Sequence, residues 1–239
     1  MLTGRAAQLV LSPVLAAQAL QVIRKTPRLP EAAGPRAGSS GTGRPLRLLI
    51  LGDSSAAGVG AQHQHDALSG HLVQALSGTF SLHWRLIAQT GITTRAIPNM
   101  LRNHGRAQFD VAVTALGVND VTRLVSPKQW SAQTRLVHDI LKRDFGVRRI
   151  YGTAIPPIAQ FPALPNPLGL VLGKHAAAMM ARLTADLAQD ATVRMVEPKW
   201  GFDPTKMATD GFHPGPETYA RWGTEMAHHI LADLPAGAS

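Results

Sequence analysis

The sequence predicts an α/β fold in which a parallel sheet carries helices on both faces. From residue 46 onwards, short apolar runs of strand length alternate with stretches of helical character. This is the order expected when each parallel strand is followed by a crossover helix. The first run, 46–51, is apolar at every position except Arg47, as in strands that are buried on both faces. We therefore expect one domain over residues 46–232.

The elements of this domain follow from local patterns of apolar residues. Strands are expected at Leu46–Leu51, Leu82–Ala88, Phe109–Leu116, Arg148–Ala154 and Val193–Glu197. Helices are expected at roughly 61–77, 93–104, 127–144, 173–189 and 215–232. In such sheets a ligand binds beyond the carboxyl ends of the strands, so residues that follow directly after a strand are the first candidates for a site.

The composition excludes several classes of site. The chain has 239 residues, no cysteine, 45% hydrophobic and 16% charged residues. This is an ordinary globular composition, and it rules out disulfides, thiol catalysis and cysteine-bound zinc. The net charge is +9. The basic excess lacks interleaved aromatic residues, so nucleic acid is not an expected partner.

The N-terminal segment, residues 1–25, is apolar and basic. Residues 6–23 carry no charge, and Arg24, Lys25 and Arg28 follow. Eighteen residues are barely enough to span a membrane, and basic residues directly behind an apolar stretch disfavour export. Two roles stay open: a helix at an anionic membrane surface, bound through residues 1–28, or a helix packed on the domain. A cytoplasmic or membrane-associated protein is therefore expected rather than an exported one.

The remaining segments lie outside the predicted domain. Residues 26–45 are rich in Pro, Gly and Ser and predict a linker. Residues 233–239 are expected to form a short tail.

Three motifs follow predicted strands or precede the last predicted helix. The first strand ends in Gly52-Asp53-Ser54, which puts a hydroxyl at the sheet edge near the next helix, where unpaired backbone N–H groups can hold negative charge. The third strand ends in Gly117-Val118-Asn119-Asp120, where an amide can donate to a developing oxyanion. Each motif also has a simpler explanation, since Ser and Asp cap helices and Gly, Asn and Asp form turns.

The C-terminal motif is Asp210-Gly211-Phe212-His213-Pro214. A carboxylate three residues before a histidine can fix the tautomer of the imidazole, and Pro214 suits the first position of the last helix. A surface histidine is the alternative for His213 taken alone. Taken together, the motifs supply a nucleophile, a base, an orienting acid and an oxyanion donor on one rim.

These motifs make the sequence similar to the SGNH (GDSL-type) hydrolases, whose four blocks centre on Ser, Gly, Asn and His. Gly52-Asp53-Ser54 resembles the first block, Gly91 the second, the motif around Asn119 the third and the motif around His213 the fourth. The resemblance covers roughly residues 46–232. Ser55 stands where the family often has leucine, but the position of the family's nucleophile matches Ser54.

The resemblance implies a three-layer flavodoxin-like fold whose five parallel strands have the order 2-1-3-4-5. It implies ester hydrolysis in which Ser54 attacks, His213 is the base and Asp210 orients it. The oxyanion would be held by the backbone N–H groups of Ser54 and Gly91 and by the side chain of Asn119. The family needs no metal or other cofactor.

The segment 155–172 is apolar, holds five prolines and follows the fourth predicted strand. We expect this segment either to line an acyl pocket or to form a stiff loop over the core. The candidate substrate-binding residues are Asp53, Phe161, Leu164 and Leu168. We expect a serine esterase for small-molecule esters with small acyl groups. The alternatives are lysophospholipase-like or sugar O-acetylesterase activity, and, in a different class, a catalytically decayed membrane-surface protein.

Overall fold

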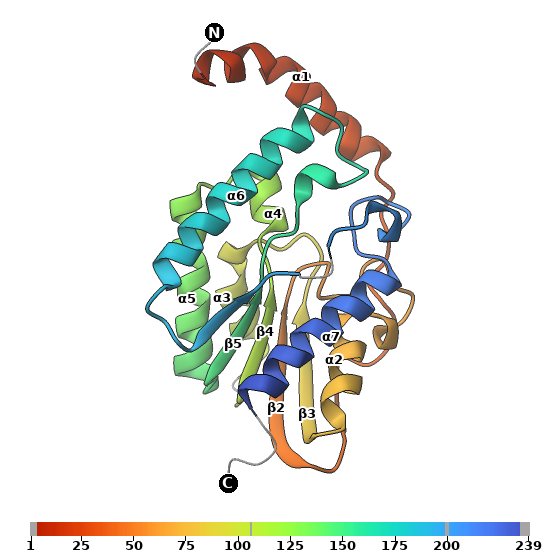
Figure 1. Ribbon diagram of the computed structural model, residues 1–239, viewed down its shortest axis with the longest axis vertical. Coiled ribbons are helices and arrows are strands. Elements are labelled where there is room, and N and C mark those ends of the chain that lie inside the picture. Colours follow the sequence, from red (N-terminus) through yellow and green to blue (C-terminus); the bar gives the residue numbers. More distant parts are fainter. Residues whose placement is uncertain (1–3, 106, 199–200, 235–239) are drawn as a thin grey trace.

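The computed structural model describes residues 4–105, 107–198 and 201–234. They form a mostly parallel sheet with helices on both faces (Figure 1). Its strands, in the order in which they lie side by side, are β1 Ala37–Ser40, β3 Phe80–Ala88, β2 Arg44–Gly52, β4 Val111–Ala115, β5 Arg149–Thr153 and β6 Val193–Val196. Strands β2 to β6 are parallel and have the predicted order 2-1-3-4-5. The fold class is therefore confirmed, with one strand more than expected.

The additional strand, β1, lies inside the segment 26–45 that the sequence predicts to be a linker. It pairs antiparallel with β3. The residues before it also contact the domain: the carboxylate of Glu31 accepts hydrogen bonds from the N–H and hydroxyl of Thr90, and Arg36 donates to the carbonyl of Ala88. In the structure this segment is thus part of the folded domain and extends the sheet by an edge strand.

Helices α2 Leu68–Ser77 and α7 Pro216–Asp233 lie on one face of the sheet, and α3 Ile97–Asn103, α5 Pro127–Phe145 and α6 Leu168–Leu187 lie on the other (Figure 1). The short helix α4, Val118–Thr122, follows β4. Single 3-10 turns are formed by Gln64–Asp66, Thr94–Ala96, Ile158–Gln160 and Pro204–Lys206.

Strand β2 explains why the first apolar run is continuous. Leu48 and Ile50 are fully buried in the cluster that contains α2 and α7, whereas Leu49 and Leu51 are fully buried in the cluster that contains α3 and α5. Because successive side chains of a strand point to opposite faces, a strand between two helical layers needs apolar residues at every position. This burial fixes β2 at the centre and its carboxyl end, Gly52, at the candidate site.

Helix α1, Gly4–Lys25, lies beyond the carboxyl edge of the sheet, over the start of α6 (Figure 1). Leu15, Ala19 and Val22 pack against a buried cluster of the domain. The side-chain amide of Gln18 donates to the carbonyl of Asn166 at 2.6 Å and accepts from the N–H of Leu168 at 3.0 Å. One side of α1 therefore packs on the domain.

Over residues 13–25, whose burial the structure describes, the other side of α1 is open to solvent. Leu20 and Ile23 are 52% and 69% exposed, and the basic residues Arg24 and Lys25 form the last turn. None of the helices described by the structure is both long and apolar enough to cross a membrane.

Candidate active site

Ser54 lies two residues beyond the end of β2 and is buried. Gly52 is required here because β4 approaches closely: a Cβ at this position would lie 2.4 Å from the carbonyl oxygen of Ala115. The sequence places Ser54 near the start of a helix, but the structure differs. Residues 54–60 form successive turns, and α2 starts only at Leu68. Glycines 58 and 60 have positive φ in these turns, and the helix begins seven residues after the predicted start at residue 61.

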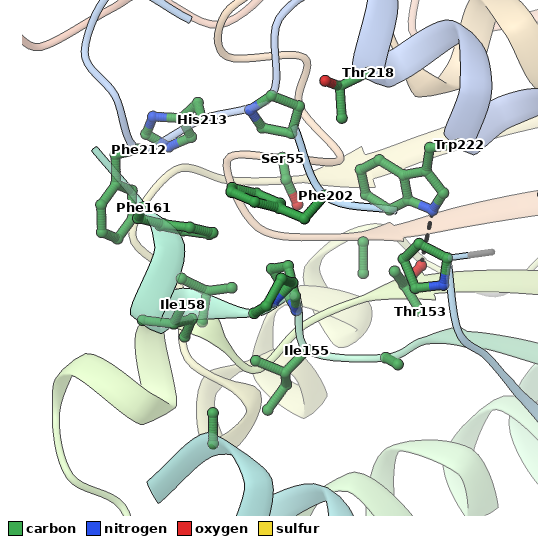
Figure 2. A pocket seen from close by; sticks show the side chains of 18 of the residues that line it. Ser55, Thr153, Ile155, Ile158, Phe161, Phe202, Phe212, His213, Thr218 and Trp222 are labelled. Carbon is green, nitrogen blue, oxygen red and sulfur yellow. Dashed lines mark hydrogen bonds between the residues drawn. The ribbon is translucent and has the colours of Figure 1, made fainter. Parts of the chain in front are cut away.

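His213 lies in the loop between β6 and α7 and faces Ser54 (Figure 2 labels the ring). Its Nε2 is 2.9 Å from the hydroxyl oxygen of Ser54, and its Nδ1 is 2.6 Å from Oδ2 of Asp210. The other oxygen of Asp210 accepts the backbone N–H groups of Phe212 and His213 at 2.9 and 3.0 Å. The three side chains predicted from the sequence thus form one continuous hydrogen-bonded chain.

The electrostatics of Asp210 suit an orienting carboxylate. Its side chain is fully buried, and burial alone would raise its pKa. The hydrogen bonds from the His213 ring and from the two backbone N–H groups outweigh burial and hold the pKa below its ordinary value. An ionised carboxylate at this position accepts a hydrogen bond from the protonated Nδ1 of His213. The other ring nitrogen, Nε2, is then unprotonated and can accept a proton.

The last helix begins at Pro216, one residue after the start of the predicted range and two residues after Pro214, which the sequence favours as its first position. Pro216, not Pro214, occupies its first turn, and Gly215 is its N-cap. Pro214 instead forms an isolated antiparallel bridge with Met207, and the carbonyl of His213 accepts the N–H of Ala208 at 2.8 Å. These contacts fold the histidine loop back on itself and hold the ring over Ser54.

Asn119 lies in α4, directly after β4. Its Nδ2 donates to the carbonyl of Ile92 at 3.0 Å and makes a longer contact of 3.3 Å with Asp53. Gly117 has a φ of +122°, and a Cβ there would collide with Ile155. A glycine is therefore needed for the chain to turn and bring the amide to the rim.

Gly91 lies in the loop after β3 and has a φ of +77°. This loop is held to its neighbours by two hydrogen bonds. The carbonyl of Gly91 accepts one from the guanidinium of Arg123, and the carbonyl of Ile92 accepts one from the amide of Asn119. Among the described residues, none accepts a hydrogen bond from the backbone N–H groups of Gly91 and Ser54. Free N–H groups of this kind can bind an oxyanion.

Asp53 is buried, and its carboxylate contacts Ser55 of the same loop and Asn119 of α4. It accepts the N–H and hydroxyl of Ser55 at 3.0 and 2.8 Å and contacts the amide of Asn119. Burial raises the pKa of Asp53, and the hydrogen bonds from Ser55 act against that rise. Its contacts therefore position Ser55 and Asn119.

A cavity of about 570 Å³ opens beside Ser54 and His213 (Figure 2). Of the four candidate substrate-binding residues, Phe161 and Asp53 line it, whereas Leu164 and Leu168 do not and are buried in the core cluster that contains α6. The sequence interpretation missed Met180, Phe202 and Trp222, which also line the cavity, as do Ile155 of the proline-rich segment and Phe212. Phe212 belongs to the C-terminal motif, but the sequence assigns no role to it there.

The segment 155–172 is a loop only as far as Pro167, since α6 begins at Leu168, five residues before the predicted start. Within the described part of the chain, no three His, Asp or Glu side chains are grouped so as to hold a metal ion.

Comparisons with known proteins show the family of the chain and its fold. The family model of the GDSL-like lipase/acylhydrolases matches residues 50–221, which include Ser54, Gly91, Asn119, Asp210 and His213. The chain belongs to this family. As a GDSL-like hydrolase it is a carboxylic ester hydrolase. No similar sequence is found among curated proteins.

Solved structures share the fold of this GDSL-like hydrolase at low sequence identity. A carbohydrate acetylesterase family member from Sinorhizobium meliloti is 21% identical with a TM-score of 0.57 over 79% of this chain and 99% of its own. An aryl esterase from M. smegmatis is 18% identical with a TM-score of 0.58 over 78% and 99%. Axe2, an acetylxylan esterase from Geobacillus stearothermophilus, is 15% identical with a TM-score of 0.54 over 82% and 96%.

Proposed function

We propose that the protein is a serine esterase in which Ser54 is the nucleophile, His213 the general base and Asp210 the residue that orients it. The observation that carries this proposal is the hydrogen-bonded chain from Asp210 through His213 to Ser54, with distances of 2.6 and 2.9 Å. His213 takes the hydroxyl proton as Ser54 attacks the acyl carbonyl, and it then protonates the leaving alcohol. Water hydrolyses the acyl-enzyme by the same route.

The oxyanion that forms on the acyl carbonyl needs hydrogen-bond donors. The N–H groups of Ser54 and Gly91 and the amide of Asn119 are the donors in this proposal. Asn119 is anchored through its bond to Ile92, so its amide is ordered before substrate binds. Donors that are fixed in advance stabilise developing charge without a reorganisation cost.

The substrates in this proposal are small-molecule carboxylic esters, including those with small acyl groups. Two of the similar structures are carbohydrate or acetylxylan esterases and one is an aryl esterase, which keeps a sugar O-acetyl ester as the second candidate. A lysophospholipase-like activity is the third. A decayed, non-catalytic protein is disfavoured by the intact hydrogen-bonded chain at Ser54.

The proposal is tested by hydrolysis of para-nitrophenyl acetate and butyrate, with Asn119→Ala as the decisive variant. We expect turnover by the wild type and a kcat lower by roughly 10²–10³ in the variant, with little change in KM, because the amide would act mainly in the transition state. Asn99→Ala, on an exposed position of α3, is the matched control and should be unchanged. A lower melting temperature with normal kcat would contradict the assignment.

We further propose that α1 holds the protein at an anionic membrane surface, which also favours a membrane-associated location over export. The packed side of α1 leaves Leu20 and Ile23 exposed, next to Arg24, Lys25 and Arg28. Exposed apolar side chains enter the headgroup region, and each basic residue near an anionic surface adds about 1 kcal/mol.

Binding to vesicles tests this second proposal. The full chain should co-sediment with vesicles that contain phosphatidylserine and bind much less to phosphatidylcholine vesicles or at high salt. The double variant Leu20→Ser with Ile23→Ser should bind at least tenfold more weakly, because two exposed apolar side chains are lost. Leu136→Ser, at a 50% exposed position of α5, is the control. Equal binding by all three proteins, or none by the wild type, would contradict the proposal.

A further inference from the structure

One wall of the cavity beside Ser54 is made of aliphatic side chains. Ile155 and Ile158 come from the segment after β5, and Figure 2 shows them across the opening from Ser55 and His213. Ile158 is fully buried, so this wall is anchored in the core. A volume of about 570 Å³ lies within the range of pockets that enclose a whole small molecule. An acetyl group alone would leave most of it empty.

A second wall is made of three aromatic rings that support one another. Phe161 stacks on Phe202 with ring centroids 5.6 Å apart, and Phe161 and Phe212 form a T-shaped pair with ring centroids 5.4 Å apart. Phe161 is buried, and the Phe212 ring in turn lies 5.4 Å from the ring of His213. The aromatic wall thus runs directly up to the reacting histidine and is held in place before any ligand enters.

Among the described residues that line the cavity, the polar side chains other than Glu197 are bonded to other protein groups. The hydroxyl of Thr153 accepts Trp222 Nε1 at 3.2 Å, and the hydroxyl of Thr218 donates to the carbonyl of Lys206 at 2.9 Å. Ser55 donates to Asp53. Glu197 is exposed to solvent. A sugar ring needs several free donors and acceptors to replace its bonds to water, whereas an alkyl chain needs none.

We infer that this cavity is an acyl pocket and that the preferred substrates are esters of aliphatic acids of medium chain length, rather than acetylated sugars. The inference rests on the proposed role of Ser54, since it takes the acyl carbonyl to be held between Ser54 and Asn119 with its alkyl chain directed along the isoleucine and phenylalanine walls. Every methylene that leaves water for these walls adds to transition-state binding.

A chain-length series of para-nitrophenyl esters, from acetate to decanoate, tests the inference on the full-length protein. We expect kcat/KM to rise about three- to fourfold for each added methylene, the factor that corresponds to burying one CH₂, with the maximum at hexanoate or longer. Peracetylated glucose and acetylated xylose should be hydrolysed no faster than para-nitrophenyl acetate. A maximum at acetate, or a preference for the acetylated sugars, would overturn the inference.

Helix α6 supplies a variant and its matched control. Ala177 lines the cavity, and the next residue, Ala178, is not among the residues that line it. Both are exposed to solvent, so a phenylalanine at either position does not overpack the core. Ala177→Phe should lower kcat/KM for octanoate at least tenfold and leave acetate within about twofold. Ala178→Phe should change neither.

The outcomes distinguish a failure of the acyl pocket from a failure of the proposed esterase activity. Ser54-dependent hydrolysis of acetate with no gain for longer chains would overturn the acyl pocket and leave the esterase intact. Equal effects of Ala177→Phe on octanoate and acetate would also overturn it. Hydrolysis of none of the esters would overturn the proposed function, and the pocket inference with it.

Discussion

Replacement of Ser54 by alanine is expected to lower kcat/KM for any ester substrate by about 10⁴-fold or more. The hydroxyl of Ser54 is the one that His213 Nε2 contacts, at 2.9 Å, so its removal deletes both the attacking atom and the proton that the base accepts. Binding and the oxyanion donors remain and account for the weak residual rate. Initial rates with para-nitrophenyl butyrate, together with a melting curve to show that the variant is folded, measure the effect.

The neighbouring Ser55 provides the control for this prediction. Its hydroxyl donates to Asp53 at 2.8 Å and, unlike that of Ser54, has no contact with His213 among its hydrogen bonds. Ser55→Ala should therefore keep its activity within about tenfold of the wild type. A serine-directed organophosphonate should add one label, on Ser54, as detected by mass spectrometry of peptides. A label on Ser55, or full activity of Ser54→Ala, would refute the assignment of the nucleophile.

The parallel sheet could be predicted from the sequence because its strands carry their own signal. The run around Leu48 is apolar at nearly every position since both of its faces are buried. The candidate site residues could then be sought directly after the carboxyl ends of the strands. Strand β1 carries no such signal. Its sequence, Ala-Gly-Ser-Ser, is exposed for most of its length, and it is held by antiparallel pairing with β3. Contacts between distant residues of this kind leave no local pattern.

The candidate nucleophile, base and orienting acid could be predicted because each belongs to a short motif at the end of an element. The lining of the cavity could not. Phe161, Leu164 and Leu168 lie in one apolar segment, yet only Phe161 faces the cavity. Which side of an irregular, proline-rich segment faces a ligand depends on its path in space. The same holds for Trp222 of α7, whose ring faces the cavity through packing of the helix on the sheet.

Helix α1 could be predicted as an apolar segment but not assigned to one of its two roles. Its packed residues, Leu15, Ala19 and Val22, recur at helical spacing, but apolar residues such as Leu20 and Ile23 occupy the opposite side as well. A helix that is apolar on both sides gives no single preferred face. The contact of Gln18 with Asn166 and Leu168 decides which side packs.

Replacement of Asp210 by asparagine is expected to lower kcat by about 10³–10⁴ while the fold is retained, since the corresponding change in a serine-protease triad has an effect of this size. The asparagine oxygen can keep the bonds to the backbone N–H groups of Phe212 and His213, which now go to Oδ1. Its NH₂ group then faces His213 Nδ1, in place of Oδ2 at 2.6 Å. A donor at this position requires Nδ1 to be the acceptor and puts the ring proton on Nε2, where it faces Ser54.

A ring with its proton on Nε2 cannot accept the proton of Ser54, so the loss should appear in kcat rather than in KM. Asp203→Asn is the matched control. Asp203 accepts the N–H and hydroxyl of Thr205 in a similar turn but has no bond to a histidine, so this variant should retain the wild-type kcat. Steady-state kinetics and melting curves on both variants check the prediction. If Asp210→Asn kept kcat within about tenfold, the tautomer of His213 would have to be fixed by another group, and Asp210 would serve only to fold its loop.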